Sequence, residues 1–263
     1  NKLMRLALSI EYIGRKYFGW QKQNSNSINT VQYHVDTALS KIANHKIKSV
    51  CSGRTDTGVN ALNQIIHFDT TSRRSDKNWI DGVNSNLPND IRLKNLFHVD
   101  NDFHARFSAH SRTYKYFINT NSECSIFNNT YTWVIQNKLS FTHMKSSLRY
   151  LKGIQDYTSF KSSGCQSNSP MRNIIKTSLD RDKDIIIFTI TANAFLYHMV
   201  RNIVGTIVDI GLRNIKPSHL KTIILNKDRK YCSKMAPANG LFLWNSSYPK
   251  KYRIKYNKES ILM

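Results

Sequence analysis

Two kinds of hydrophobic spacing alternate along the first hundred residues. Leu6, Leu8 and Ile10 occupy every second position, which is the period of a strand with one buried face. Between residues 31 and 42 apolar side chains recur at helical spacing instead, and Thr30 stands where an N-cap belongs. The other elements predicted for this half are strands at 47–51, 64–68 and 91–99 and a helix that begins near residue 76. The order is β-α-β-β-α-β, a split βαβ arrangement.

The second half repeats this order without repeating the sequence. Its predicted elements are strands at 113–118, 173–179, 184–191 and 241–244 and helices at 141–151 and 196–212. We therefore expect an α+β fold of two split-βαβ-like halves, each with a mixed or antiparallel sheet and helices on one face. The domains are predicted at residues 1–101 and 102–263, with the active-site cleft between them.

Positive charge dominates the composition. The chain has 39 Lys and Arg residues against 17 Asp and Glu residues, which gives a formal net charge of +22. So large a net charge makes the folded chain repel itself, and proteins that carry one usually bind a polyanion. The polyanion can be a nucleic acid or an anionic membrane surface. No apolar run approaches the roughly 20 residues that span a bilayer, so nucleic acid is the expected partner and a membrane is not.

Cysteine usage indicates neither a zinc site nor a disulfide framework. The four cysteines form no C-x-x-C pair and have no histidine at metal-ligand spacing, so we expect no metal site. Scattered free thiols fit a reducing compartment, and we expect the protein in the cytoplasm. These residues are Cys51, Cys124, Cys165 and Cys232.

One string is dense in groups that carry chemistry: residues 52–59 read Ser-Gly-Arg-Thr-Asp-Thr-Gly-Val. Its two glycines allow backbone conformations that hold a loop in a fixed pose. Arg54 and Asp56 are two residues apart, so an extended backbone places them on one side, where the guanidinium keeps the carboxylate ionised. The same pattern is also typical of an Asx turn beside a surface ion pair. The loop alone does not identify a reaction.

Five strings spread over residues 11–205 carry a more specific pattern. They include Gly-Arg-Thr-Asp-Thr-Gly-Val, Val-Asn-Ser-Asn-Leu-Pro and Phe-His-Ala-Arg-Phe-Ser-Ala, and they occupy residues 11–21, 53–59, 83–88, 103–109 and 193–205. In this order they resemble the motifs of the tRNA pseudouridine synthase A family. Several motifs in order are far more specific than any one of them.

The resemblance implies a homodimer that acts on tRNA, with uridines at nucleotides 38 to 40 of the anticodon stem-loop as targets. It implies that Asp56 is the catalytic aspartate, that Tyr114 lies against the target base and that Arg201 is the ionic partner of Asp56. Residues expected to bind the substrate are Arg54, Asn60, His104, Arg106 and Tyr114. Asn60 departs from the family pattern, which usually has histidine there. Asparagine donates and accepts hydrogen bonds but supplies no titrating imidazole.

The reaction that the resemblance implies suits a cofactor-free enzyme. Pseudouridine forms when the N1–C1′ bond breaks and a C5–C1′ bond forms, so no electrons leave, and the sequence has no dinucleotide fingerprint or P-loop. We expect no cofactor. An aspartate, with a reference pKa of about 3.9, is an anion at neutral pH. Asp56 can attack C1′, attack C6 or remove the 2′ proton, and the sequence leaves these three routes open.

Two rival functions share part of this pattern. A non-catalytic basic RNA-binding protein would also carry the net charge of +22, but it would not need Asp56. A metal-dependent nuclease needs clustered carboxylates, and the acidic residues here are few and dispersed.

We also expect Phe18 and His198 in the core, because aromatic residues and histidines beside apolar neighbours are most often buried.

Overall fold

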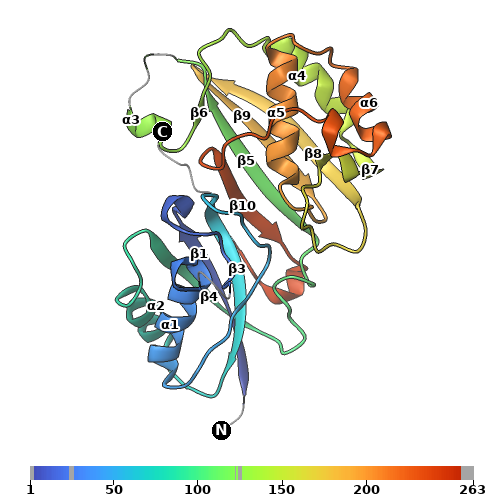
Figure 1. Ribbon diagram of the computed structural model, residues 1–263. Coiled ribbons are helices and arrows are strands. Elements are labelled where there is room, and N and C mark those ends of the chain that lie inside the picture. Colours follow the sequence, from blue (N-terminus) through green and yellow to red (C-terminus); the bar gives the residue numbers. More distant parts are fainter. Residues whose placement is uncertain (1–2, 24–26, 122, 124–125, 256–263) are drawn as a thin grey trace. The chain divides into compact units, whose positions relative to one another are not determined.

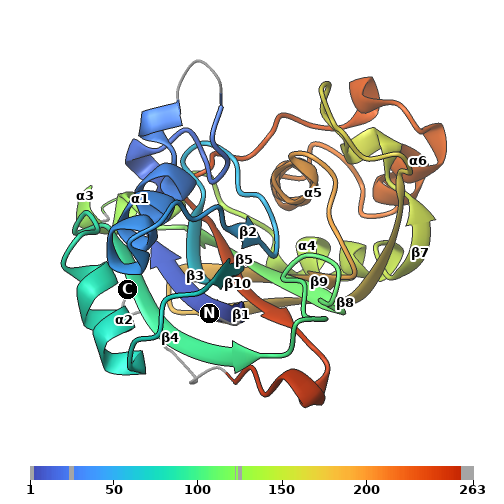
Figure 2. The same cartoon turned by 90° about the horizontal axis from the view of Figure 1, so that it is seen from below.

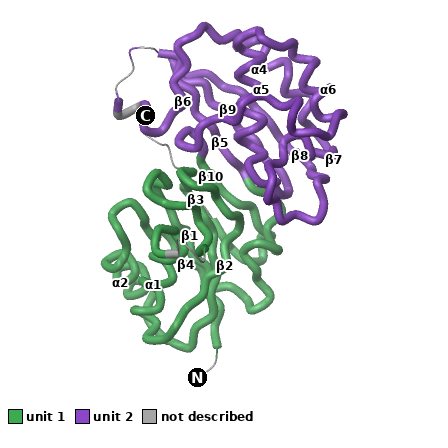
Figure 3. Tube along the Cα trace, viewed as in Figure 1, with its two compact units in different colours: residues 1–112, 242–263 green, residues 113–241 purple. Residues whose placement is uncertain are grey.

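The computed structural model describes residues 3–23, 27–121, 123 and 126–255 (Figure 1). The chain divides into two compact units (Figure 3). Unit 1 contains residues 1–112 and 242–263, and unit 2 contains residues 113–241. Each unit combines strands with helices, which confirms the predicted α+β class.

Unit 1 is built on four strands in the order β4-β1-β3-β10. Strand β1 pairs antiparallel with both β3 and β4, whereas β10 runs parallel to β3 through the pairs Phe242–Asn60 and Leu243–Ala61. A short strand, β2, pairs with β3. The bounds are β1 Met4–Tyr12, β2 Val50–Cys51, β3 Asn60–Thr70, β4 Ile91–Val99 and β10 Leu241–Ser247.

Helices α1 (Val31–Ala43) and α2 (Asp76–Asn84) lie side by side in unit 1 (Figures 1 and 2). Ser75 caps α2 by accepting the Asn78 N–H at 3.2 Å. Trp79 of α2 packs on Phe68 of β3 with ring centroids 5.6 Å apart. These helices therefore cover the sheet face to which Phe68 and its strand partner Leu6 belong.

The other face of the unit 1 sheet is covered as well. Ala7 of β1 and Ile65 of β3 pack in one buried cluster with Phe103, Ala105 and Tyr252. Consecutive residues of β1 are consequently all buried from Leu6 to Ile10. β1 is mostly apolar, whereas β3 also buries Asn60, Gln64 and His67, and each of these polar side chains has a hydrogen-bonding partner.

Unit 2 has its main strands in the order β5-β9-β8-β7, and β6 pairs parallel with β5. The pairs β8–β9 and β7–β8 are antiparallel. Helix α5 is buried along nearly its whole length and packs on α4. The strands are β5 Ser111–Asn119, β6 Trp133–Val134, β7 Gly153–Asp156, β8 Met171–Asp182 and β9 Ile185–Ala192. The helices are α3 Ile126–Asn129, α4 Phe141–Ser147, α5 Met199–Gly211 and α6 His219–Asn226.

The predicted order of elements in the first half is confirmed, and all the main strands and helices predicted for the second half are present. Helix α5 begins at Met199 rather than at residue 196, because His198 adopts a left-handed conformation with φ of 60° and acts as its N-cap. Thr30 occupies the N-cap position of α1, although its side chain makes no capping bond. Strands β6 and β7 and helices α3 and α6 were not predicted.

The division of the chain differs from the predicted boundary near residue 101. Unit 1 continues to Arg112, because Phe103 and Ala105 pack into its core. The last strand also belongs to unit 1, since β10 pairs with β3. The strand predicted at residues 241–244 is present, but from Phe242 onward it is part of unit 1 rather than of the second half. A pairing this distant in sequence leaves no trace in local periodicity.

Two findings concern what the described part of the chain lacks. No helix in residues 3–23, 27–121 and 126–255 is both long and apolar enough to cross a membrane. The same residues contain no group of three or more His, Cys, Asp and Glu side chains placed to hold a metal ion. Cys51, Cys165 and Cys232 are free thiols, and Cys124 lies outside the described residues.

His67 makes the stability of unit 1 depend on pH. It is buried in β3, and its Nδ1 accepts the Ala105 N–H at 3.1 Å. Burial, followed by the charges of Arg5 and His104, lowers the pKa of His67 to about 4. An unfolded histidine titrates near about 6.5, so the unfolded state binds more protons between that pH and about 4.

We therefore expect the free energy of unfolding to fall as the pH is lowered from about 6.5 towards 4. His67→Gln keeps an acceptor but does not titrate, so it should reduce this dependence. Urea unfolding at pH 7 and pH 5 measures the difference for wild type and variant. His110→Gln, at an exposed side chain, is the matched control. An equal loss of stability in wild type and His67→Gln would contradict the assignment.

Candidate functional site

The loop at residues 52–59 joins β2 to β3, and its first residues are fixed to β3. The Ser52 N–H donates to the Ile65 carbonyl at 2.7 Å. The Gln64 side chain is buried, accepts a hydrogen bond from Ser52 Oγ at 2.8 Å and donates to the Gly53 carbonyl at 2.6 Å. A side-chain amide with two such bonds fixes both the direction and the register of the loop at its start.

The middle of this loop is held by residues 12–20. The Tyr12 hydroxyl and Thr55 Oγ1 are 2.7 Å apart, and the Trp20 N–H donates to the Thr55 carbonyl at 3.1 Å. Gly19 approaches this carbonyl so closely that a Cβ there would lie 2.5 Å from its oxygen, and its φ of +78° also favours glycine. Thr55, the residue before Asp56, is therefore constrained from two sides.

Asp56 itself begins a tight turn. The Val59 N–H donates to the Asp56 carbonyl at 3.1 Å, and Gly58, at the third position of the turn, has a φ of +79°. A type II turn needs glycine at that position. The Gly58 N–H also donates to the Tyr17 carbonyl at 3.3 Å. The half-buried Asp56 side chain thus projects from a backbone that is held on both flanks.

Tyr17 and Asp90 anchor the segment that supports the loop, and the sequence did not single out Asp90. The Tyr17 hydroxyl donates to the Asp90 carboxylate, and the Asp90 carbonyl accepts the Ile13 N–H at 3.0 Å. Burial and the bond to Asp90 raise the pKa of Tyr17, so its hydroxyl is a neutral donor at physiological pH. Phe18, which was predicted to be in the core, is 41% exposed, because Tyr17 and Trp20 take the buried positions.

Asn60, predicted to bind the substrate, is buried at the first position of β3 with 3% of its surface exposed. Its Oδ1 accepts the Gly14 N–H at 2.9 Å. The side chain therefore ties β3 to the segment that supports the loop. A contact between Asn60 and the substrate stays a prediction.

Arg54 is exposed on the loop, and its charge opposes the effect of burial on the neighbouring Cys51 thiol. Burial raises the pKa of Cys51 to about 12, while Arg54, Arg106 and Arg112 all act to lower it. Cys51 is therefore a protonated thiol at physiological pH. Three guanidinium groups influence this one position, so the start of the loop lies in a positive field.

Arg112 is the main functional candidate that sequence reasoning missed. It is buried, and its Nε and Nη2 donate to the Ser52 carbonyl at 3.1 and 2.9 Å. Its Nη1 donates to the Ala109 carbonyl at 3.2 Å, and its Nη2 also donates to the Arg106 carbonyl. One side chain thus joins the Asp56 loop to residues 103–109. The signal in the sequence was an arginine on an otherwise alternating strand.

His104 and Arg106, also predicted to bind the substrate, lie within that segment. His104 Nδ1 accepts the N–H groups of Arg106 and Phe107 at 3.2 and 3.1 Å. Burial, followed by the charges of Arg5 and Arg106, lowers the pKa of His104 and keeps Nδ1 available as an acceptor. The Arg106 side chain is exposed.

Tyr114 and Arg201 belong to unit 2. Tyr114 is buried on β5, and its ring meets Phe195 edge to face with centroids 5.1 Å apart. Arg201 on α5 donates through Nε to the Ala236 carbonyl at 2.8 Å. Its charge also influences Tyr116, which lies two residues from Tyr114 on the same face of β5. The roles expected of Tyr114 and Arg201 stay predictions.

His198 has a hydrogen-bonding partner in unit 2, as expected for a structural histidine. Its Nδ1 lies 3.0 Å from Ser162 Oγ, and its ring stacks on Tyr197 at 3.7 Å. Burial, followed by the charges of Arg201 and Arg229, lowers the pKa of His198 to about 4. The imidazole is therefore neutral at physiological pH, although it is half-buried rather than fully in the core.

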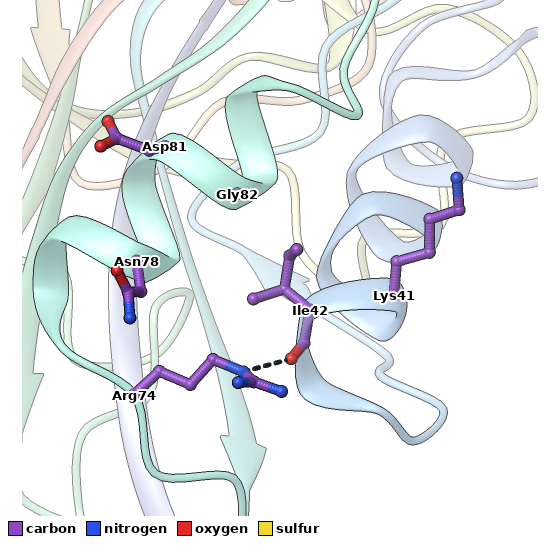
Figure 4. Close-up of a pocket in the computed structure, with 6 residues that line it drawn as sticks. All are labelled: Lys41, Ile42, Arg74, Asn78, Asp81 and Gly82. Carbon is purple, nitrogen blue, oxygen red and sulfur yellow. Dashed lines mark hydrogen bonds between the residues drawn. The ribbon is translucent and has the colours of Figure 1, made fainter.

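A surface hollow of about 400 Å³ lies between α1 and α2 in unit 1 (Figure 4). Arg74 bridges one side of it by donating from Nε to the Ile42 carbonyl at 2.7 Å. None of the predicted site residues lines it. The lining residues are Lys41, Ile42, Arg74, Asn78, Asp81 and Gly82.

Comparison with known proteins shows the family. The profile of a family described as tRNA pseudouridine synthase matches residues 8–108 and 148–249. A tRNA pseudouridine synthase A of Buchnera aphidicola subsp. Schizaphis graminum is 43% identical over 264 residues, which cover 100% of this chain and 99% of that protein. A tRNA pseudouridine synthase A of Legionella pneumophila (strain Lens) is 44% identical, with 97% and 96% covered. The chain belongs to the tRNA pseudouridine synthase family.

The buried bond between Asn60 and Gly14 gives a test of the loop's support. Asn60→Ala removes the acceptor and leaves the Gly14 N–H unsatisfied, so the free energy of unfolding should fall by about 1–3 kcal/mol. Urea denaturation measures this change. Asn101→Ala, at an exposed side chain, is the matched control and should change stability little. If both variants are as stable as wild type, the bond does not support the loop.

Proposed function

We propose that this protein isomerises uridine to pseudouridine in tRNA, at nucleotides 38 to 40 of the anticodon stem-loop, with Asp56 as the catalytic carboxylate. The observation that carries the proposal is the 52–59 loop. Hydrogen bonds from Gln64, Trp20 and Arg112 hold its backbone, and it presents a half-buried carboxylate. The chain's family and its similarity to relatives named tRNA pseudouridine synthase A supply the reaction.

The geometry of the loop suits a carboxylate that acts on a sugar or a base. Catalytic groups act best when their position is fixed before the substrate arrives, because no reorganisation is then needed in the transition state. Thr55 and Gly58, on either side of Asp56, are both hydrogen-bonded to residues 12–20. The Asp56 backbone is therefore pre-ordered.

The reaction is balanced without a redox partner. The N1–C1′ bond breaks, the C5–C1′ bond forms, the C5 proton leaves to solvent and N1 gains a proton. Asp56 takes part in this reaction as an anion, whether it attacks C1′, attacks C6 or removes the 2′ proton. In each route the ionised carboxylate is the group that starts the chemistry.

Tyr114 and Arg201 are the proposed partners of Asp56 in the reaction. The edge contact with Phe195 fixes the Tyr114 ring, which favours stacking against the target base. Arg201 is held by the Ala236 carbonyl through Nε, and a guanidinium is planar and permanently charged, which suits it to orient a carboxylate. The net charge of +22 suits a polyanionic substrate such as tRNA.

Asp56→Asn tests the central assignment. The change is nearly isosteric and removes the negative charge, so turnover should fall on the order of 10⁴- to 10⁶-fold. Affinity for tRNA should not weaken, because the variant carries one anion fewer. The assay follows tritium released to water from uridine C5 when C5 bonds to C1′.

Asp100→Asn is the matched control, since it removes an exposed carboxylate elsewhere in unit 1 and should leave turnover unchanged. A non-catalytic RNA-binding protein would release no tritium even as wild type. Release by Asp56→Asn within tenfold of wild type, at equal bound tRNA, would show that Asp56 is not the catalytic carboxylate.

The proposed assembly is a homodimer. Sedimentation at micromolar concentration should then give about twice the chain mass of 30.5 kDa. Activity should also fall on dilution below the dissociation constant of the dimer. The dimer then dissociates, and the separated protomers of an obligate dimer are not stably folded. A monomer that keeps full activity at nanomolar concentration would exclude this assembly.

A further inference from the structure

We propose that Phe107 is a stacking platform for an unpaired base of the RNA substrate, with Arg106 beside it to contact the backbone phosphate. This inference rests on the proposed function in taking RNA as the ligand. It adds a binding position for a second, non-reacting nucleotide.

The Phe107 ring is 75% exposed, whereas Phe68, Phe103, Phe160 and Phe188 are at most 2% exposed. A single exposed apolar side chain is common and indicates nothing by itself. What sets Phe107 apart is the order of the turn that presents it. An ordered backbone has already lost the conformational entropy that binding otherwise costs.

Hydrogen bonds within the turn hold its backbone. His104 Nδ1 accepts the N–H groups of both Arg106 and Phe107. Ser108 closes the turn, since its N–H donates to the His104 carbonyl at 2.8 Å and its Oγ accepts the His104 N–H at 2.9 Å. Every N–H from His104 to Ser108 other than that of Ala105 is thus satisfied inside the turn.

Bonds to the rest of unit 1 fix the turn in place. Ala105 is buried, its N–H donates to His67 Nδ1 at 3.1 Å and its carbonyl accepts the Tyr248 hydroxyl at 2.6 Å. The Arg112 guanidinium donates to the Arg106 carbonyl and to Ser52, the first residue of the Asp56 loop. The position of Phe107 is therefore fixed relative to that loop within the same unit.

The surroundings of the ring match a nucleotide. The imidazole of His104 stacks on Phe107 with centroids 4.3 Å apart and planes at 29°. The Arg106 guanidinium carbon lies over the ring, 5.4 Å from its centroid, and the ring is nevertheless 75% exposed, so an exposed aromatic surface and a positive charge lie together. A nucleotide offers the π face of its base to the ring and its phosphate to the guanidinium. An apolar protein surface offers nothing to Arg106.

Three substitutions at Phe107 separate stacking from simple apolar contact. Phe107→Ala and Phe107→Leu should weaken binding of an unmodified tRNA transcript by roughly 5- to 150-fold, as expected for the loss of one base–aromatic stack. Phe107→Trp keeps a stacking surface and should bind as wild type. None should change binding of a fully paired RNA duplex of similar length, because its bases are not available.

The salt dependence distinguishes the two residues of the platform. Stacking releases no counterions, so the slope of log affinity against log salt should be unchanged in Phe107→Ala. Arg106→Gln should lower the magnitude of that slope by about 0.7, the value for one phosphate contact on a single strand. Circular dichroism and sedimentation of each variant check that fold and assembly are intact.

Several outcomes overturn the platform. The first is a Phe107→Ala variant that binds the transcript with wild-type affinity. The second is a loss of affinity that is equal for transcript and duplex. The third is a Phe107→Leu variant whose affinity equals that of Phe107→Trp. A change of sedimenting mass in Phe107→Ala would place the ring in a protein interface instead. If wild type binds the transcript but releases no tritium from C5, the proposed reaction fails. The stacking result then stands on its own.

Discussion

A buried guanidinium organises unit 1. Arg112 donates to the carbonyls of Ser52, Arg106 and Ala109, and a cation taken out of water is tolerated only when its donors find acceptors. Because those acceptors belong to two separate segments, the loop that carries Asp56 and the turn that carries Phe107 keep one mutual placement. Neither segment has regular secondary structure that would hold it otherwise. The site in this unit depends on side-chain to backbone bonds more than on the sheet itself.

A second constraint comes from close backbone approach. Gly19 lies against the Thr55 carbonyl, where any larger residue would force the two segments apart. The Tyr17–Asp90 bond and the Asn60–Gly14 bond hold the same segment, residues 12–20, at two further points. Thr55 and Gly58 are therefore restrained by several independent contacts, which is the condition under which a catalytic side chain keeps its pose.

The spacing of apolar residues predicted individual strands and helices, but it did not predict which strands distant in sequence pair with each other. Strand β1 and helices α1 and α2 followed from the spacing of their large apolar residues in the sequence, although β1 is in fact buried on both faces. The membership of β10 in unit 1 did not, since it depends on a parallel pairing with β3, to which Asn63 adds a bond with the Trp244 carbonyl. Asp56, Tyr114 and Arg201 were chosen through the family resemblance. The roles of Arg112 and Asp90 depend on partners that are distant in sequence, so local spacing does not encode them.

Asn60 shows how the structure changes the meaning of a departure from a family pattern. Its position requires an acceptor for the Gly14 N–H, and it is buried. A histidine there would have to accept the same bond through an unprotonated ring nitrogen. Asparagine accepts it through an amide oxygen that does not titrate. The position therefore needs an acceptor for the Gly14 N–H, and asparagine supplies one without depending on pH.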